Sequence, residues 1–352
     1  MAIGYSGTIL TSTDGTTWTS RSSGTSNKLK GITYGNSTFV AVGVSGTILT
    51  SSDATTWTSR TSGTSNFLGN VTYKNSTFMA IGKSGTILTS SDGTTWTSKT
   101  SGTSKDLWGI TYGNSTWVTN GDNGSIFTSS DGTSWDNRTS ASGTTVEFNE
   151  VIYGNSTLVV VGFSGTILTS SDGTTWTSRT SGTSNNLGNV TYRNSTFMAI
   201  GNSGTILTSS DGTGWTARTS GTTKNLWGVT YGNSTWVANG DNGTIISSSD
   251  GTSWDNRTSD SVTTEEFNEV IYENSTFVAF GNSGTIRTSS DGTTWDNRTS
   301  GTSNNLPGGT NGNSIFVTVG NSGTILTSSD ATTWTSRTSG TSLNFRRVFY
   351  KE

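Results

Sequence analysis

The chain has 352 residues, and its 20 lysine and arginine residues against 23 aspartate and glutamate residues give a net charge of −3. This near-neutral balance argues against a nucleic-acid partner. The absence of histidine and cysteine excludes Ser-His-Asp and Cys-His nucleophiles, imidazole or thiolate metal sites, and disulfides. Charged residues make up only 12% of the chain, which has 13 Trp, 13 Phe and 9 Tyr, a composition typical of a folded chain. We expect no cofactor and no bound metal.

The sequence shows no basic segment followed by an apolar one at its start, and no apolar run long enough to cross a bilayer. We therefore expect no membrane partner. We also expect a monomer. The sequence leaves the cellular compartment open.

In chain order, the N-terminal residues 1–4 match the end of the second strand of a repeat, and residues 344–352 match a first strand. Between these ends every repeat has four strand-like runs separated by turn residues. In the fifth repeat the runs are residues 187–192, 195–201, 204–209 and 213–219. We expect Asn194-Ser195 to turn between the first two strands. Between the third and fourth strands, we expect the Asp211 carboxylate to accept hydrogen bonds from backbone N–H groups and Gly212 to adopt a positive φ.

A short box of the form Ser-x-Asp-x-Thr-x-Trp recurs nine times along the chain. Its aspartates are Asp14, Asp53, Asp92, Asp131, Asp172, Asp211, Asp250, Asp291 and Asp330, and its tryptophans are Trp18, Trp57, Trp96, Trp135, Trp176, Trp215, Trp254, Trp295 and Trp334. Successive box tryptophans are 39 or 41 residues apart, and a period near 40 with short alternating apolar segments is typical of propeller blades.

These observations predict an all-β fold, a closed nine-bladed β-propeller of four-stranded antiparallel blades. The ninth blade takes its first strand from the C-terminus and the other three from the N-terminus, so that few strand edges stay unpaired. We expect a single domain over residues 1–352.

A longer period is superimposed on the blades. Three successive blades differ in sequence, and the same three kinds of blade recur in the same order, so that equivalent residues are 119 positions apart. Examples are the pairs Trp108 and Trp227, Asp122 and Asp241, and Glu150 and Glu269. The offset predicts a pseudo-threefold super-repeat of three blades. The third copy has Arg346 and Tyr5 at the Trp and Asp positions, so we expect two equivalent sites and not three.

The box, as in Ser90-Ser91-Asp92-Gly93-Thr94-Thr95-Trp96, resembles the Asp-box, or bacterial neuraminidase repeat, of sialidases, sortilin-type receptors, photosystem II assembly factors and several lectins. The resemblance covers the whole chain. It implies a β-propeller in which the box aspartate holds a hairpin turn and the tryptophan packs between blades. Such a box is structural, and fold does not fix function, so function has to be sought in the loops.

The resemblance to sialidases raises the alternative of a glycoside-processing enzyme, which implies an arginine cluster, a Tyr/Glu pair and an Asp acid. Eight arginines each stand three residues after a box tryptophan, so they repeat one strand position and do not converge. Glu150 and Tyr153 are three apart on one strand and point to opposite faces. A catalytic pair would need carboxylates of different blades. The sequence leaves open that Asp122 or Asp241 meets one of Glu147, Glu150, Glu265 and Glu269. We predict no catalytic residue.

The variable residues lie in the two sets of loops that share one face of a propeller, where recognition is usually found. Trp108 and Trp227 lie near Asp122-Asn123 and Asp241-Asn242 of the same blade, and an aromatic plane beside such polar groups suits a sugar. Core packing is the alternative, in which Trp108 fills space left by Gly69. The candidate ligand-binding residues are Trp108, Asp122, Asn123, Glu150, Trp227, Asp241, Asn242 and Glu269.

The sequence thus predicts a non-catalytic recognition scaffold for a glycan or protein ligand. A sialidase-like enzyme and an architectural repeat scaffold without a selected ligand are the alternatives. Converging, non-repeated carboxylates would favour the enzyme, and equivalent sites on matching blades would favour the recognition scaffold.

Overall fold

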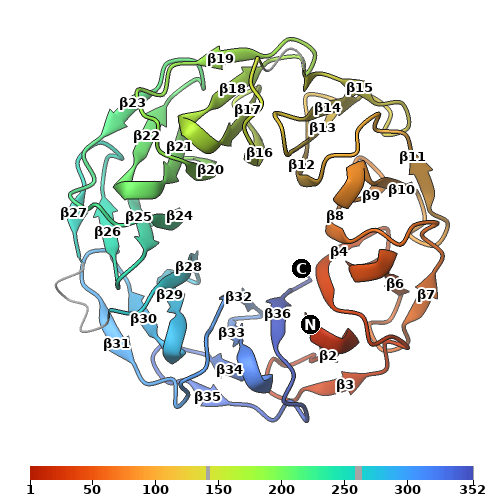
Figure 1. Cartoon of the computed structure of the whole chain (residues 1–352). Helices are drawn as coiled ribbons and strands as arrows, with labels where there is room; N and C mark the ends of the chain where they lie inside the picture. Colours follow the sequence, from red (N-terminus) through yellow and green to blue (C-terminus); the bar gives the residue numbers. More distant parts are fainter. Residues whose placement is uncertain (140–142, 258–263, 352) are drawn as a thin grey trace. The chain divides into compact units, whose positions relative to one another are not determined.

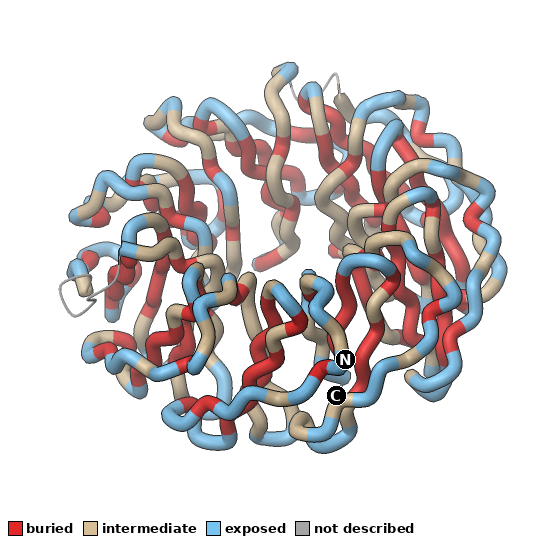
Figure 2. Tube along the Cα trace, turned by 60° about the horizontal axis from the view of Figure 1, so that its bottom comes forward, coloured by how far each residue is buried: buried red, intermediate tan, exposed pale blue. Residues whose placement is uncertain are grey.

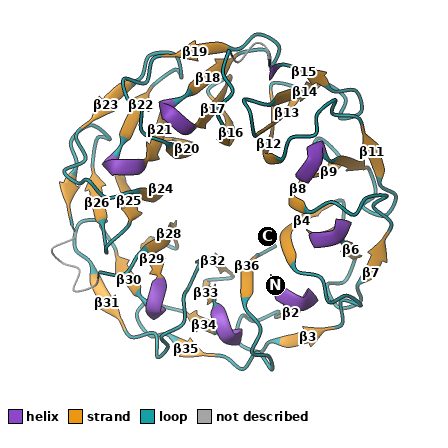
Figure 3. Ribbon diagram, in the orientation of Figure 1, coloured by secondary structure: helices purple, strands orange, loops and turns teal. Residues whose placement is uncertain are grey.

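The computed structural model describes residues 1–139, 143–257 and 264–351. The fold is all-β: nine four-stranded antiparallel blades in a ring, a nine-bladed β-propeller. The predicted fold class is therefore confirmed. Figure 1 labels the strands, and Figure 3 separates them from the short 3-10 turns and the loops.

Eight blades contain four strands in chain order, and the ninth combines β36 with β1, β2 and β3. The first strands are β4 (Leu29–Gly35), β8 (Leu68–Lys74), β12 (Leu107–Gly113), β16 (Phe148–Gly154), β20 (Leu187–Arg193), β24 (Leu226–Gly232), β28 (Phe267–Glu273), β32 (Gly308–Gly312) and β36 (Phe345–Val348). The second strands are β1 (Ala2–Gly4), β5 (Thr38–Gly43), β9 (Thr77–Gly82), β13 (Thr116–Gly121), β17 (Thr157–Gly162), β21 (Thr196–Gly201), β25 (Thr235–Gly240), β29 (Thr276–Gly281) and β33 (Ile315–Val319).

The third strands are β2 (Ile9–Thr11), β6 (Ile48–Ser51), β10 (Ile87–Ser90), β14 (Ile126–Ser129), β18 (Ile167–Ser170), β22 (Ile206–Ser209), β26 (Ile245–Ser248), β30 (Ile286–Ser289) and β34 (Ile325–Ser328). The fourth strands are β3 (Thr19–Arg21), β7 (Thr58–Arg60), β11 (Thr97–Lys99), β15 (Asp136–Asn137), β19 (Thr177–Arg179), β23 (Thr216–Arg218), β27 (Asp255–Asn256), β31 (Asp296–Arg298) and β35 (Thr335–Ser336). The 3-10 turns η1 (Tyr5–Gly7), η2 (Val44–Gly46), η3 (Lys83–Gly85), η4 (Phe163–Gly165), η5 (Asn202–Gly204), η7 (Asn282–Gly284) and η8 (Asn321–Gly323) connect second to third strands.

The fourth strands are shorter than the sequence predicts. In the fifth blade the expected run 213–219 shrinks to β23 (Thr216–Arg218). The reason is the box: the carboxylate of Asp211 accepts the backbone N–H of Thr213 at 2.7 Å, so the residues after it belong to the turn and not to the ladder.

The predicted turns have the expected backbone. Asn194 and Ser195 have φ values of 45° and 52°, the positive pair that a two-residue turn with right-handed strand twist requires. Gly212 has a φ of 82°. Ala54, which takes the glycine position in another box, is held at a φ of 62°, a conformation that costs an L-residue free energy.

Both termini contribute to one blade, as the sequence predicts. Strand β1 lies between β2 and β36 in the sheet β3-β2-β1-β36, and Ala2 pairs with Val348 while Ile3 pairs with Arg347. The Met1 amino group also donates to the carbonyl of Phe349 at 2.8 Å. Of the predicted C-terminal run, Glu352 lies outside the described residues.

By internal contacts the chain divides into two compact units, one comprising Met1–Ser26, Ile200–Ile206 and Arg218–Glu352 and the other Asn27–Ala199 and Leu207–Ala217. Each unit has apolar clusters that join neighbouring blades. In the second unit Val40 and Val42 of one blade pack with Phe78 and Leu88 of the next. In the first unit Val237 packs with Phe267 and Phe277. Figure 2 shows buried residues along the strands and exposed residues at the turns. The expectation of one domain over residues 1–352 stays a prediction.

The structure adds one finding on membranes. In the described part of the chain, no helix has the length and apolar character of a membrane-spanning segment.

Candidate functional site

The box aspartates hold hairpin turns. Asp92 is representative: its Oδ1 accepts the backbone N–H groups of Thr94 at 2.8 Å and Thr95 at 2.9 Å, and the hydroxyl of Ser90 at 2.9 Å. Trp96 donates its indole N–H to the carbonyl of Gly93 at 2.7 Å. The Thr95 N–H, followed by the other donors, holds the pKa of the Asp92 carboxyl well below its usual range. This geometry makes the box a structural device.

The arginines that follow the boxes are bound within their own blades. Arg60 donates its Nε–H to Thr50 Oγ1 at 2.8 Å, and Arg179 does the same to Thr169 at 2.7 Å. In three blades the arginine also pairs with an aspartate two residues earlier, as in Arg298 with Asp296 at 2.7 Å. The expectation that these arginines do not converge agrees with these contacts.

Trp108 is placed by a β-bulge. In strand β12 the pairing register shifts between Leu107 and Gly109, so Trp108 is the extra residue, and a bulge re-aims such a side chain. Its indole Nε1–H donates to Asp122 Oδ1 at 2.7 Å. The two residues that the sequence places near each other are thus in direct contact.

The matching blade repeats this arrangement. A register shift between Leu226 and Gly228 makes Trp227 the extra residue of β24, and its indole N–H donates to Asp241 Oδ1 at 2.6 Å. Trp227 is 39% exposed, and Trp108 is partly buried. Neither tryptophan lies in the core.

The space above Gly69 is not filled by Trp108. A Cβ built on Gly69 would meet only the ring of Phe67 within 4 Å. These contacts do not favour the space-filling alternative for Trp108, and the bulge and the bond to Asp122 account for its position.

The asparagines next to these aspartates form tight turns. Asn123 and Asn242 have φ values of 56° and 54° and are exposed. The turn closes as Ser125 N–H donates to the carbonyl of Asp122 at 3.1 Å. Each turn therefore presents an exposed amide beside the Trp–Asp pair.

One further carboxylate lies near the first pair. Burial, and then the negative charge of Asp122, raises the pKa of Glu147. Its counterpart in the matching blades, Glu266, instead accepts from the side-chain amide of Asn282 at 3.4 Å. Glu147, just before β16, and Asp122, just after β13, come from neighbouring blades, so a carboxylate pair between blades stays the alternative that an enzyme would require.

Glu150 and Glu269 lie elsewhere in their blades, on β16 and β28, and bind the next blade. Glu150 Oε2 accepts the backbone N–H of Val190 at 3.1 Å, and Glu269 Oε2 accepts that of Gly309 at 3.0 Å. Burial raises the pKa of Glu150 to about 7, opposed by the Val190 N–H. Each of these bonds links neighbouring blades, and the assignment of Glu150 and Glu269 as ligand-binding residues stays a prediction.

Two buried asparagines in the same blades escape the sequence analysis. Asn120 and Asn239 are fully buried where other blades have valine, isoleucine or phenylalanine. Their amides donate to the carbonyls of Phe148 at 3.1 Å and Phe267 at 2.9 Å. Within the described residues their Oδ1 atoms have no hydrogen-bond donor. Their recurrence at an offset of 119 in otherwise apolar strands is the signal that could have found them.

The third copy of the site differs as predicted. Arg346 and Tyr5 occupy the Trp and Asp positions of the blade built from both termini, and both are exposed. Two Trp–Asp pairs therefore exist where the super-repeat has three positions. In the described residues, no group of acidic residues forms a metal site.

Comparison with known proteins supports the fold. No family model and no curated protein sequence match the chain. Among solved structures, the computationally designed protein Ika8 is similar with a TM-score of 0.63 at 14% identity, covering 88% of this chain and 96% of that one. Chaetomium thermophilum Sqt1 is similar with a TM-score of 0.57 at 12% identity, covering 84% and 93%.

YCF48 bound to a D1 peptide is similar with a TM-score of 0.50 at 17% identity, covering 72% of this chain and 90% of that one. At these identities the similarity shows the fold alone. The resemblance to photosystem II assembly factors is thus confirmed as a propeller fold, while membership of the Asp-box family stays a prediction.

Proposed function

We propose that the chain is a non-catalytic recognition scaffold with two equivalent glycan-binding sites, formed by Trp108 with Asp122 and Asn123, and by Trp227 with Asp241 and Asn242. The observation that carries this proposal is the partly exposed indole of Trp227, fixed by its 2.6 Å bond to Asp241. A ring held in place loses little conformational entropy when a sugar stacks on it.

The groups around each ring complement a sugar. The indole N–H occupies one carboxylate oxygen of Asp241, so the second oxygen accepts a sugar hydroxyl, and the exposed amide of Asn242 both donates and accepts. An apolar plane with a few placed polar groups is the usual composition of a small-ligand site.

The contacts of the charged residues support a role without catalysis. Box aspartates bind turn N–H groups, the arginines bind threonines of their own blades, and Glu150 binds a backbone N–H of the next blade. Each of these groups is engaged in holding the fold. The Trp–Asp pair occurs at equivalent positions of two matching blades, and this repetition favours the recognition scaffold over the sialidase-like enzyme.

A peptide ligand is the second candidate. YCF48, whose fold is similar, is bound to a D1 peptide. The loops near Trp108 also carry the ion pair of Lys83 and Asp106 at 3.8 Å, a charged feature that suits a polar peptide.

The test is a glycan array probed with the intact chain and with the Trp108→Ala/Trp227→Ala double variant. We expect glycan binding by the intact chain and none by the double variant. Tyr5→Ala is the matched control, because Tyr5 is 38% exposed at the third equivalent position, and its binding should equal that of the intact chain. Glycan binding retained by a folded double variant would contradict the proposal. No binding on the glycan array, together with binding on a peptide array, would favour a peptide ligand.

A further inference from the structure

A cavity of about 390 Å³ lies on the blades that contain β28, β32 and β36. It is separate in its residues from the Trp227–Asp241 pair. Its lining includes Glu269, Pro307, Thr310, Val319 and Arg347. Its volume falls at the lower end of the range of about 300–1,000 Å³ found for small-molecule sites.

At one wall of the cavity the third copy of the super-repeat has glycines where the second copy has side chains. Residues 119 positions earlier than Gly308 and Gly309 are Asn189 and Val190. A Cβ at Gly308 would collide with Glu269 Oε2, so the carboxylate lies in space that a side chain would otherwise need. Glycine here therefore makes room for Glu269 to line an open pocket.

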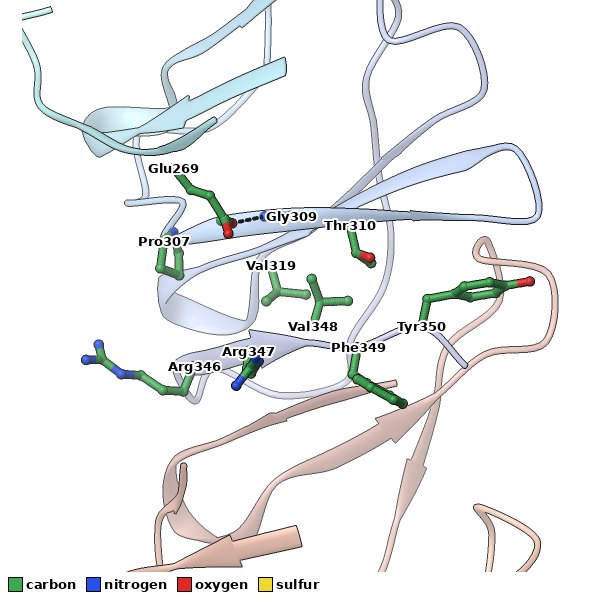
Figure 4. Close-up of a pocket in the computed structure, with 11 residues that line it drawn as sticks. Glu269, Pro307, Gly309, Thr310, Val319, Arg346, Arg347, Val348, Phe349 and Tyr350 are labelled. Carbon is green, nitrogen blue, oxygen red and sulfur yellow. Dashed lines mark hydrogen bonds between the residues drawn. The ribbon is translucent and has the colours of Figure 1, made fainter. Parts of the chain in front are cut away.

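A positively charged side chain, Arg347, also lines this cavity. Arg347 corresponds by the same offset to Gly228, and its exposed side chain lines the cavity. Figure 4 shows the carboxylate of Glu269, with its bond to Gly309, and the guanidinium of Arg347 on different sides of the cavity, with Val319 and Val348 between them. The side chain of Arg346 points away from the others in this view.

The two charges are held apart. Among the described residues, no ion pair within 4.0 Å joins Glu269 to Arg347. Each charge can therefore form a charge-assisted bond with a ligand, an ammonium group with the carboxylate and a carboxylate group with the guanidinium. The half-buried Val348 offers an apolar surface in the cavity for the rest of such a ligand.

From this arrangement we propose that the cavity binds a small zwitterion, an α-amino acid or a dipeptide, with its ammonium group at Glu269 and its carboxylate at Arg347. The electrostatics agree with this orientation. Burial raises the pKa of Glu269, while the Gly309 N–H and then the charge of Arg347 lower it. A ligand ammonium group supplies the counter-charge that a partly buried carboxylate lacks.

The test measures the shift in melting temperature of the whole chain with each of the proteinogenic amino acids and with glycylglycine. Each ligand is added at up to about 10 mM, because a site with a Kd of about 1 mM is then mostly occupied. Each ligand that binds is titrated by calorimetry and compared with its N-acetylated and amidated derivatives. We expect at least one zwitterion to bind and both blocked derivatives to lose at least about tenfold in affinity, a loss of about 1.4 kcal/mol.

Two variants and two controls decide the assignment. Glu269→Gln keeps an acceptor for the Gly309 N–H and removes the charge, and Arg347→Gln removes the opposite charge. Each should weaken binding at least about tenfold. Arg193→Gln, an exposed arginine of another blade that does not line the cavity, and Glu150→Gln, in the blade without this cavity, should bind as the unaltered chain does. Failure of every zwitterion to bind, or equal binding by Glu269→Gln, would overturn the proposal without bearing on the glycan sites.

Discussion

The buried carboxylate of Glu150 makes stability depend on pH in a way that one substitution removes. Its pKa rises to about 7 from an ordinary value of 4.5 because burial penalises the charged form. The unfolded chain therefore ionises first. The contribution of the neutral Glu150 to the free energy of unfolding is fully present below about pH 4.5 and is lost between about pH 4.5 and 7. Above about pH 7 the free energy of unfolding stays at the lower level. At about 1.4 kcal/mol per pKa unit, the full loss is roughly 3 kcal/mol at most.

Glu150→Gln keeps the shape and an acceptor for the Val190 N–H and carries no charge. We expect the variant to match the unaltered chain in free energy of unfolding at pH 4 and to exceed it by up to about 3 kcal/mol at pH 8. Urea unfolding followed by tryptophan fluorescence, at several pH values between 4 and 8, measures the difference. The exposed Glu273→Gln is the control. Parallel curves for Glu150→Gln and the unaltered chain would refute the reasoning.

Three further predictions concern stability. Ala54→Gly should stabilise the chain by about 0.5–1 kcal/mol in thermal unfolding, because Ala54 is held at a φ of 62°, and a lower melting temperature would contradict this. Asn239→Ala should cost about 1–3 kcal/mol in urea unfolding, because its buried amide bonds the next blade at 2.9 Å. The exposed Asn297→Ala, at an ordinary strand position of β31, is its control, and equal effects would disprove the role. Asp92→Ala should cost about 1–2 kcal/mol at neutral pH through its lost turn bonds. That cost should shrink as the pH falls below the ordinary aspartate pKa of 3.8. The pKa of Asp92 is lower in the folded chain than in the unfolded chain, so protonation in acid removes its stabilising contribution. A cost that stays constant in acid would argue against this role.

Local sequence determines most of the blade. The box residues bond within their own turn, as Asp211 does with Thr213, so their repetition was enough to predict the hairpin and its spacing. The pairing of residues 345–348 with 2–4 also followed from the repeat, because each terminus carries the part of the blade that the other lacks.

Contacts between blades could not be predicted in this way. The bonds from Glu150 to Val190 and from Asn120 to Phe148 join residues 40 and 28 positions apart, and strand alternation gives the face of a side chain and not its partner on another sheet. The cavity beside Glu269 depends on glycines in one blade and an arginine in another. The sequence identified Asp122 as a neighbour of Trp108. The exposure of the Trp108 side chain depends on a β-bulge, which composition does not reveal.

The stoichiometry of ligand binding tests the central claim most directly. A glycan identified on the array, titrated by calorimetry into the intact chain, should bind at two equivalents, and at one equivalent to Trp108→Ala and to Trp227→Ala alone. A stoichiometry unchanged by either substitution would contradict the assignment of the Trp–Asp pairs as recognition sites.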